Sequence, residues 1–153
     1  EDAVERRVEL ANELTAALAD LPGVTTPQVR PGDVHTYWKY CLGVDAKRIP
    51  GGSVQLGAAL KKRGIFSAPR YIQKPAFACE IFREQRTFGA SRWPFTLARR
   101  DAVDYSPEKF IGTYEGLERV LVLPWNERYT SDHVRYIADS IIESVAELQK
   151  VAA

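Results

Sequence analysis

Apolar residues recur with a helical period near both ends of the chain. The first predicted helix spans residues 1–20 and ends at Pro22-Gly23, because proline cannot continue a helix and glycine accepts a positive φ. The second spans residues 130–151, with Thr130 as its N-cap. In each helix the apolar positions form one stripe that should face a core. The stripes consist of Val4, Val8, Ala11, Leu14, Leu18 and Leu21 in the first helix, and of Val134, Ile137, Ala138, Ile141, Ile142, Val145 and Leu148 in the second.

Residues 36–44 alternate between two faces, as a half-buried strand does. Residues 25–33 precede this strand and contain two prolines and a glycine, so they should form a linker. We expect the core face of the strand to hold Trp38, Tyr40, Leu42 and Val44. The opposite face would then hold Tyr37, Lys39, Cys41 and Gly43, with His35 pointing the same way.

A helix between two strands is predicted next. Ser53 follows a Pro-Gly-Gly turn, where its hydroxyl can cap a helix that runs to Arg63. Gly64 is the expected C′ residue, and residues 65–67 then begin a new strand, which completes a β-α-β unit. Residues 118–123 form an almost continuous apolar run, which is typical of a strand buried on both faces.

Residues 71–114 hold more than half of the aromatic residues and show no clear period. A segment of this length without regular structure is unusual in a compact domain and is often functional. Between residues 70 and 100 the only acids are Glu80 and Glu84, although the whole chain has a formal net charge of +1. The sequence thus allows a local basic surface but argues against a dedicated polyanion binder. The basic residues of this stretch are Arg70, Lys74, Arg83, Arg86, Arg92, Arg99 and Arg100.

The composition is ordinary for one soluble globular domain, with 153 residues, 45% of them hydrophobic and 27% charged. Cys41 and Cys79 lack metal-ligand spacing, and we expect free thiols in a reducing cytosol, with a disulfide as the alternative. No stretch approaches the ~20 apolar residues of a membrane span. We therefore expect a cytoplasmic protein without a bound metal. Because the chain opens inside a helix without a Met, we also expect it to be a fragment of a longer protein.

Several motifs occur in an order that resembles a known family. The Arg-rich opening helix is followed by His35-x-Tyr-Trp-x-Tyr40, then Leu60-x-x-x-Gly64-Ile65, Tyr71-x-x-x-Pro75, and Leu123-Pro124 with Tyr129-Thr130. Together they resemble the C-terminal small domain of the pyridoxal-phosphate-dependent sugar aminotransferases of the DegT/DnrJ/EryC1/StrS family. The Tyr71 motif has one residue more than in many members of that family.

The resemblance implies the small domain of a fold-type I aminotransferase. We expect a two-layer α/β (α+β) domain, in which helices cover a mixed or antiparallel sheet of three or four strands. Residues 1–153 would form this single domain. Residues 1–21 would be a long connecting helix, residues 35–123 the sheet, crossover helix and aromatic-rich insertion, and residues 130–151 the terminal helix.

The resemblance also implies an enzyme that moves an amino group from glutamate or glutamine to a keto-sugar, often nucleotide-linked, or to a keto-cyclitol. The cofactor would be pyridoxal 5′-phosphate, bound between the small domain, a missing N-terminal large domain and the second subunit of a homodimer. The lysine that forms the Schiff base would lie upstream of Glu1. This chain would then close the substrate site without a catalytic residue of its own, and alone it should be inactive.

Five residues are candidates for substrate binding. A guanidinium such as that of Arg70 can hold a donor carboxylate, and the hydroxyl of Tyr71 can orient a sugar or cofactor group. His35 and Tyr37 share one predicted strand face near the active site of such enzymes, and Lys74 is a possible substrate contact. The alternatives are core packing for Tyr71, a solvated side chain for Arg70, and an exposed sheet face or a structural histidine for His35 and Tyr37.

A different class of function stays open. The basic aromatic stretch 70–100 could belong to a non-catalytic α/β module that binds a partner or an anionic ligand. Interleaved arginines and aromatics also occur on single-stranded nucleic-acid surfaces. The surplus of positive charge is local and no RNA-binding motif is present, so we do not expect nucleic acid as a partner.

Overall fold

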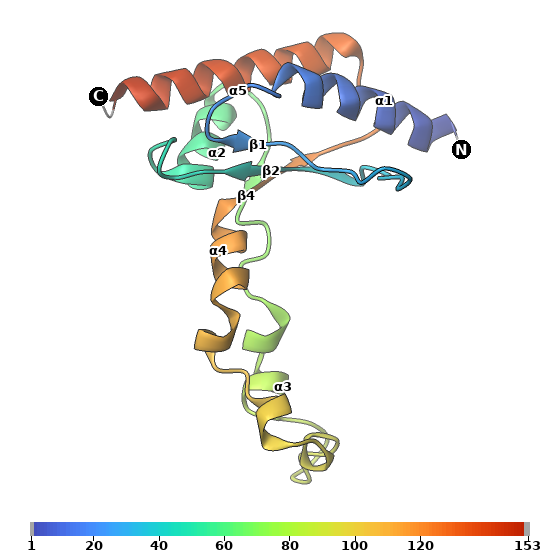
Figure 1. The fold of residues 1–153 in the computed structure, drawn as a ribbon, viewed down its shortest axis with the longest axis vertical. Coiled ribbons are helices and arrows are strands. Elements are labelled where there is room, and N and C mark those ends of the chain that lie inside the picture. Colours follow the sequence, from blue (N-terminus) through green and yellow to red (C-terminus); the bar gives the residue numbers. More distant parts are fainter. Residues whose placement is uncertain (1, 152–153) are drawn as a thin grey trace. The chain divides into compact units, whose positions relative to one another are not determined.

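The computed structural model describes residues 2–151, and the chain divides into two compact units. The first unit combines the chain up to Tyr71 with the chain from Glu118 onward, and the second is Ile72–Leu117. Figure 1 shows the ribbon. The elements of the first unit are α1 (Asp2–Ala17), β1 (Val24–Thr25), β2 (Lys39–Val44), α2 (Gly52–Lys62), β3 (Ala68–Pro69), β4 (Val120–Pro124) and α5 (Ser131–Val151).

The sheet has the order β1-β2-β4-β3, and all neighbouring strands are antiparallel. The predicted α/β architecture is therefore confirmed, with an antiparallel sheet of four strands where three or four strands, mixed or antiparallel, were expected. Because β2 and β3 both run antiparallel to β4, they run in the same direction, and α2 is the predicted crossover between them. Two boundaries were wrong. Val24–Thr25 pair with β2 although a linker was expected from Thr25, and the third strand begins at Ala68, later than predicted.

The three long helices bury one face of this sheet. Tyr40 and Leu42 of β2 lie opposite Leu123 and Leu121 of β4, and all four side chains are almost completely buried. The hydroxyl groups of Tyr40 and Thr15 are hydrogen-bonded at 2.7 Å, which connects β2 to α1. Helices α1 and α5 lie side by side over the sheet (Figure 1), and α2 contributes Leu56 and Leu60 to the same core. The core thus lies between one layer of helices and one face of the sheet.

The ends of two helices follow local sequence signals. At the start of α5 the amide of His133 donates to the Thr130 hydroxyl at 3.3 Å, and the Thr130 amide donates to His133 Nδ1 at 3.1 Å. This reciprocal pair confirms the predicted N-cap, with His133 in the position that Glu or Gln takes in a capping box. Gly64 has a φ of +75° after α2, as a C′ glycine should. Ile142, expected in the buried stripe of α5, is 38% exposed.

Ser53 does not cap α2, contrary to the prediction. The N-cap is Gly51, which makes no side-chain hydrogen bond. Ser53 is buried inside the first turn, and its hydroxyl donates to the carbonyl of Glu118 at 2.8 Å. The Ser53 hydroxyl, which the local sequence assigned to a helix cap, therefore binds the Glu118 carbonyl just before β4.

The faces predicted for residues 35–38 were also wrong. The strand begins only at Lys39. Tyr37 has a φ of +46°, which is not an extended conformation, so the side chains before Lys39 do not follow the alternation of the strand. Tyr37 is consequently 3% exposed and belongs to the core, whereas Trp38 is 70% exposed. From Tyr40 onward the predicted alternation holds, and Tyr40, Leu42 and Val44 are buried.

The second unit has little regular structure, as its lack of periodicity predicted. Three aromatic rings, Phe82, Phe95 and Tyr105, meet edge-to-face with centroids 5.4–6.4 Å apart. Phe77 stacks on Phe110 at 3.9 Å. Aromatic pairs rather than a sheet therefore hold this unit together. Its helices are α3 (Glu80–Arg83), four short 3-10 turns (Ala76–Ala78, Phe95–Leu97, Arg100–Val103 and Pro107–Phe110) and α4 (Ile111–Arg119), which continues into the first unit.

Candidate functional site

The sheet face away from the helices holds the candidate site. Alternation along β2 puts Lys39 and Cys41 on the face opposite Tyr40 and Leu42. Cys41 lies opposite Val122 of the central strand, and Val122 lies opposite Ala68 of β3. Three strands thus contribute side chains to this face, on which Cys41 is exposed, Ala68 is partly buried and Val122 is buried. The chain leaves β3 through Arg70 and Tyr71 at the edge of the sheet.

The Lys39 ammonium lies between two aromatic rings. Its Nζ is 3.8 Å from the ring centroid of Trp38 and 3.7 Å from that of Tyr71. Nζ also donates a hydrogen bond to the Tyr71 hydroxyl. A cation above an aromatic face is attracted by the ring quadrupole, so each ring restrains the ammonium and is restrained by it. We call Trp38, Lys39 and Tyr71 the lysine–aromatic cluster. It holds a half-exposed tyrosine in one orientation on the open face.

Arg70 has a constrained backbone beside this cluster. Its φ of +50° is uncommon for a residue with a side chain, and its amide donates to the carbonyl of Val120 at 2.8 Å. The guanidinium forms an ion pair with Glu118. A carboxylate ligand at Arg70 would therefore compete with Glu118, which the sequence did not suggest.

His35 and Tyr37 contact each other. Their ring centroids are 4.2 Å apart, and the Tyr37 amide donates to His35 Nδ1 at 2.9 Å. The Tyr37 ring also stacks near Tyr40, with centroids 6.0 Å apart, and burial raises the pKa of Tyr37. The structure thus gives Tyr37 a place in the core, instead of the solvent-facing position that the strand pattern predicted.

Lys74 belongs to the second unit and is exposed. Its ammonium is one of several charges that act on Glu84. The hydrogen bond from Arg83 is the main cause that lowers the pKa of Glu84, and Lys74 adds a smaller contribution of the same sign. Of the five predicted residues, His35 and Tyr37 are thus in mutual contact, Tyr71 is in the lysine–aromatic cluster, and Arg70 is paired with Glu118.

Two members of the site were not among the candidates from sequence. Trp38 was predicted to face the core, and Glu118 was predicted to begin a buried strand. A tryptophan directly before a lysine at the start of a strand was the available signal for the cluster. The pairing of Glu118 with Arg70 joins positions 48 residues apart and had no local signal.

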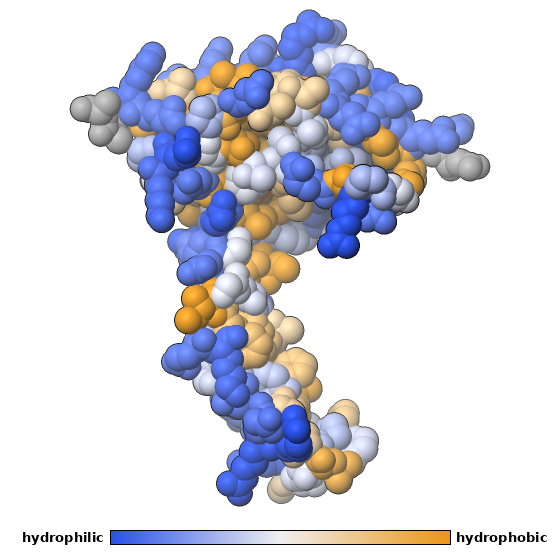
Figure 2. All heavy atoms as spheres, in the orientation of Figure 1, coloured by the Kyte–Doolittle hydropathy of each residue, from blue (hydrophilic) through white to orange (hydrophobic). Residues whose placement is uncertain are grey.

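Two arginines of the basic aromatic stretch are paired with acids of the second unit. Arg86 forms ion pairs with Glu80 and Glu84, and Arg83 pairs with Glu84. Several large apolar side chains are nevertheless exposed, among them Phe88 at 95% and Trp93 at 60%. Figure 2 shows hydrophobic residues beside hydrophilic ones around α3 and α4. A cavity of about 440 Å³ here is lined by Ile81, Phe82, Arg86, Thr87, Phe88, Trp93, Pro94 and Phe95.

The residues of this chain do not by themselves make a pyridoxal phosphate site. A Schiff-base lysine needs a phosphate cup and an acid for the ring nitrogen nearby. The Gly51-Gly52-Ser53 turn is the only stretch of the sequence that resembles such a cup, and the Ser53 hydroxyl is already bound to the Glu118 carbonyl. Lys39 lies between the rings of Trp38 and Tyr71 and not beside such a cup. Among residues 2–151, no group of His, Cys, Asp or Glu side chains is arranged to hold a metal, and no helix could cross a membrane.

The lysine–aromatic cluster should control the chemistry of the neighbouring thiol. Burial raises the pKa of Cys41, while the charge of Lys39 opposes that shift. We expect Lys39→Met to raise the pKa further and to slow alkylation of Cys41 by iodoacetamide about two- to fivefold at pH 8, because the thiolate is the reactive form. Mass spectrometry of the two cysteines gives the rates, with Cys79 as internal reference. Lys39→Arg keeps the charge and should change the rate little; equal slowing by both variants would contradict the electrostatic cause.

Comparison with known proteins agrees with the fold. The chain superposes on a putative sugar aminotransferase, Spr1654 from Streptococcus pneumoniae, with a TM-score of 0.71 and 12% identity, covering 98% of this chain and 32% of that one. The aminotransferase TlmJ from Streptoalloteichus hindustanus gives 0.65 and 17%, covering 96% and 33%. PseC from Helicobacter pylori, an aminotransferase in pseudoaminic acid biosynthesis, gives 0.63 and 17%, covering 95% and 33%.

The chain thus spans about a third of the length of these structures. No curated protein matches it. The sequence profile of the DegT/DnrJ/EryC1/StrS aminotransferase family matches residues 1–142, which is nearly the whole chain. This protein therefore belongs to the DegT/DnrJ/EryC1/StrS aminotransferase family.

Proposed function

We propose that this chain is the substrate-closing small domain of an aminotransferase that moves an amino group from glutamate or glutamine to a keto-sugar or keto-cyclitol. Its family membership and its fold support a sugar aminotransferase. The observation that carries the proposal is the lysine–aromatic cluster, because it fixes a tyrosine hydroxyl on an open sheet face. A fixed polar group at a partly exposed position is what substrate orientation requires.

The hydrogen bond inside the cluster assigns a role to each member. Lys39 donates to the Tyr71 oxygen, so the Tyr71 proton is directed to another acceptor. A hydroxyl or carbonyl oxygen of a sugar is such an acceptor. Trp38 covers one side of the ammonium and would exclude water from it when substrate is bound. Arg70 would bind the carboxylate of the amino-acid donor in exchange for Glu118.

Enzymes of this family depend on pyridoxal phosphate in general. We infer that the lysine which binds the cofactor belongs to polypeptide outside these 153 residues, since the known structures are about three times as long. The same comparison supports a large domain as the first partner of this unit. We further expect a homodimer in the cytoplasm, and we expect the isolated chain to be inactive.

Tyr71→Phe tests the proposed role in the full-length enzyme. We expect kcat for amino transfer to fall about tenfold, the effect of one lost transition-state hydrogen bond of ~1.4 kcal/mol, while the melting temperature stays nearly constant. Steady-state kinetics and thermal unfolding measure the two quantities. Tyr136→Phe is a matched control, because that half-exposed tyrosine on α5 donates only to the carbonyl of Arg63. An unchanged rate in Tyr71→Phe would mean that Tyr71 has only a packing role.

The exposed aromatic side chains of the second unit favour a second role in binding. Phe88 and Trp93 are both exposed and line the same cavity, so they bring apolar surface together at one place. We propose that this surface contacts a protein partner in addition to the role of Tyr71. Loss of that contact, without loss of fold, is the expected result of replacing Phe88 and Trp93 by Ser.

A further inference from the structure

His35 contacts the residue that comes directly before the lysine–aromatic cluster. Its Nδ1 accepts a hydrogen bond from the amide of Tyr37 at 2.9 Å, and the centroids of the two rings are 4.2 Å apart. A ring nitrogen of histidine accepts a hydrogen bond only when it carries no proton, so this contact requires a neutral imidazole with its proton on Nε2. His35 is exposed, and the pH of the solvent therefore acts on it directly.

The turn at Tyr37 has a backbone conformation that a residue of its size rarely adopts. A positive φ on a bulky residue persists only where surrounding contacts stabilise it. Tyr37 has a φ of +46°. Its amide is bonded to His35, and its ring is buried and stacks near Tyr40. Of these contacts, the hydrogen bond to His35 is the one that depends on a proton.

This turn decides where the next two side chains lie. Trp38 is 70% exposed, and Lys39 is the first residue of β2. With an extended Tyr37, the alternation of a strand would direct Trp38 into the core, as the sequence pattern predicted. The Lys39 ammonium could then no longer lie 3.8 Å from the ring centroid of Trp38 while it lies 3.7 Å from that of Tyr71. The Trp38 side of the cluster therefore depends on the turn.

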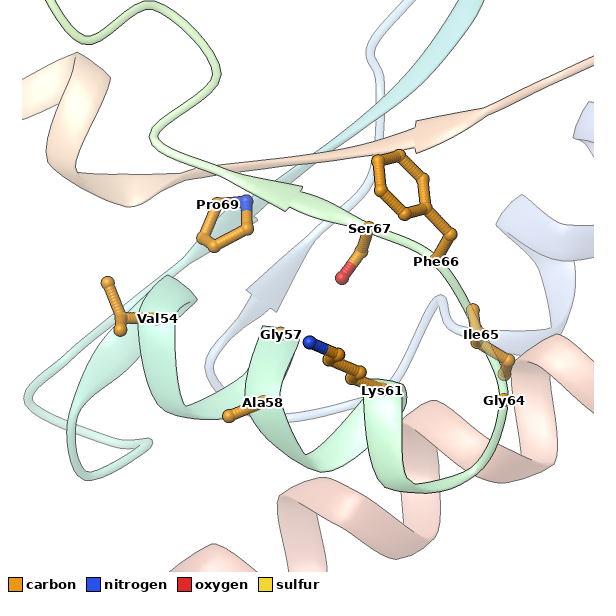
Figure 3. Close-up of a pocket in the computed structure, with 9 residues that line it drawn as sticks. All are labelled: Val54, Gly57, Ala58, Lys61, Gly64, Ile65, Phe66, Ser67 and Pro69. Atoms are coloured by element: carbon orange, nitrogen blue, oxygen red, sulfur yellow. The ribbon is translucent and has the colours of Figure 1, made fainter.

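The Tyr71 side of the cluster has a separate support. Pro69 packs closely over Gly57 of α2, where a Cβ atom would come within 3.2 Å of Pro69 Cγ. Figure 3 shows Pro69 on the side of β3 that faces this helix. The Arg70 amide also donates to the carbonyl of Val120, which fixes the chain just before Tyr71. A change in the turn should therefore move the other side of the cluster and leave the end of β3 in place.

The groups around His35 leave its own protonation as the event that affects the turn. Among residues 2–151, no acidic side chain lies within ion-pair distance of His35. Burial raises the pKa of Tyr37 and raises that of Tyr40, behind it on β2, to about 12, so both stay neutral below pH 8. The nearest charged residues in the sequence are Asp33 and Lys39. Histidine is the only side chain that ordinarily changes its charge between pH 5 and 8.

We propose that His35 is a positioning residue: its neutral imidazole keeps Trp38 and Lys39 in the lysine–aromatic cluster, and its protonation releases them. Protonation puts a hydrogen on Nδ1, which then faces the Tyr37 N–H instead of accepting a bond from it. The positive φ loses its hydrogen bond, and the Trp38 ring leaves the ammonium. The consequence for amino transfer, which would weaken in acid, rests on the function proposed above for Tyr71.

NMR of the Lys39 Hε protons in the full chain tests this proposal. Protons above aromatic rings resonate upfield, so at pH 8 these signals should lie upfield of those of the other lysines. We expect most of this displacement to be lost at pH 5. His35→Asn should keep it at both pH values, because an asparagine side chain accepts the amide two residues on and does not titrate. His35→Ala should lack most of it already at pH 8.

His133→Gln is the matched control. It removes the other histidine of the chain and leaves a side-chain acceptor at the third residue of α5, where a capping box has Glu or Gln. This variant should show the pH response of the parent. The proposal is overturned if the displacement in the parent is the same at pH 8 and pH 5, if His35→Asn does not keep it at both, or if His35→Ala keeps it at pH 8. The signal needs no substrate, so its failure is distinct from an unchanged rate in Tyr71→Phe.

Discussion

Leu121→Ala should lower the free energy of unfolding by about 2–5 kcal/mol, because it leaves a cavity at the centre of the sheet. Leu121 lies on the central strand β4, opposite Leu42 of β2 and Pro69 of β3, and it is completely buried. Its Cδ1 also lies where α2 comes closest, next to Gly57. The position thus joins both neighbouring strands and the crossover helix, and few atoms can move to fill the space.

Urea unfolding followed by circular dichroism measures this loss. Leu97→Ala is the matched control, since Leu97 is 77% exposed and removal of its side chain should change the free energy of unfolding by less than about 0.5 kcal/mol. A loss below ~1 kcal/mol in Leu121→Ala would mean that β4 is not the centre of the core. A similar loss in both variants would point to general disturbance rather than to a cavity.

The protein should lose stability in alkali through Tyr40. Burial is the main cause that raises the pKa of Tyr40 from its ordinary value of 10.0 to about 12. The folded chain then keeps a proton that the unfolded chain releases, so the contribution is complete below pH 10 and is lost as the pH rises through about 12. A shift of this size corresponds to about 2–3 kcal/mol.

Unfolding curves in urea at several pH values between 8 and 12 test this. Tyr40→Phe cannot ionise and should remove most of the alkaline slope, at the expense of the hydrogen bond to Thr15. Thr15→Val is the matched variant. The Thr15 hydroxyl lowers the pKa of Tyr40, so its removal should make the slope steeper. An alkaline slope that is the same in Tyr40→Phe and the parent would show that other groups cause it; Tyr37, whose pKa burial also raises, is the next candidate.

The local sequence predicted the elements whose signals lie within a few residues. Thr130 caps α5, Gly64 ends α2, and the apolar run before Pro124 is the central strand. A helix cap, a C′ glycine and an apolar period each depend on residues close in the sequence. Tertiary contacts therefore did not change where these elements begin and end. The order of weak motifs likewise identified the family, which the match over residues 1–142 confirms.

The tertiary structure decided the features that depend on distant groups. Ser53 binds a carbonyl 65 residues away instead of capping its helix, and a positive φ at Tyr37 exchanges the predicted places of Tyr37 and Trp38. The lysine–aromatic cluster brings Lys39 to Tyr71 across 32 residues. A hydroxyl, an amine and an aromatic ring can each satisfy several partners, and the choice among them depends on which segments the packed core brings together. Periodicity along one segment contains no information about that choice.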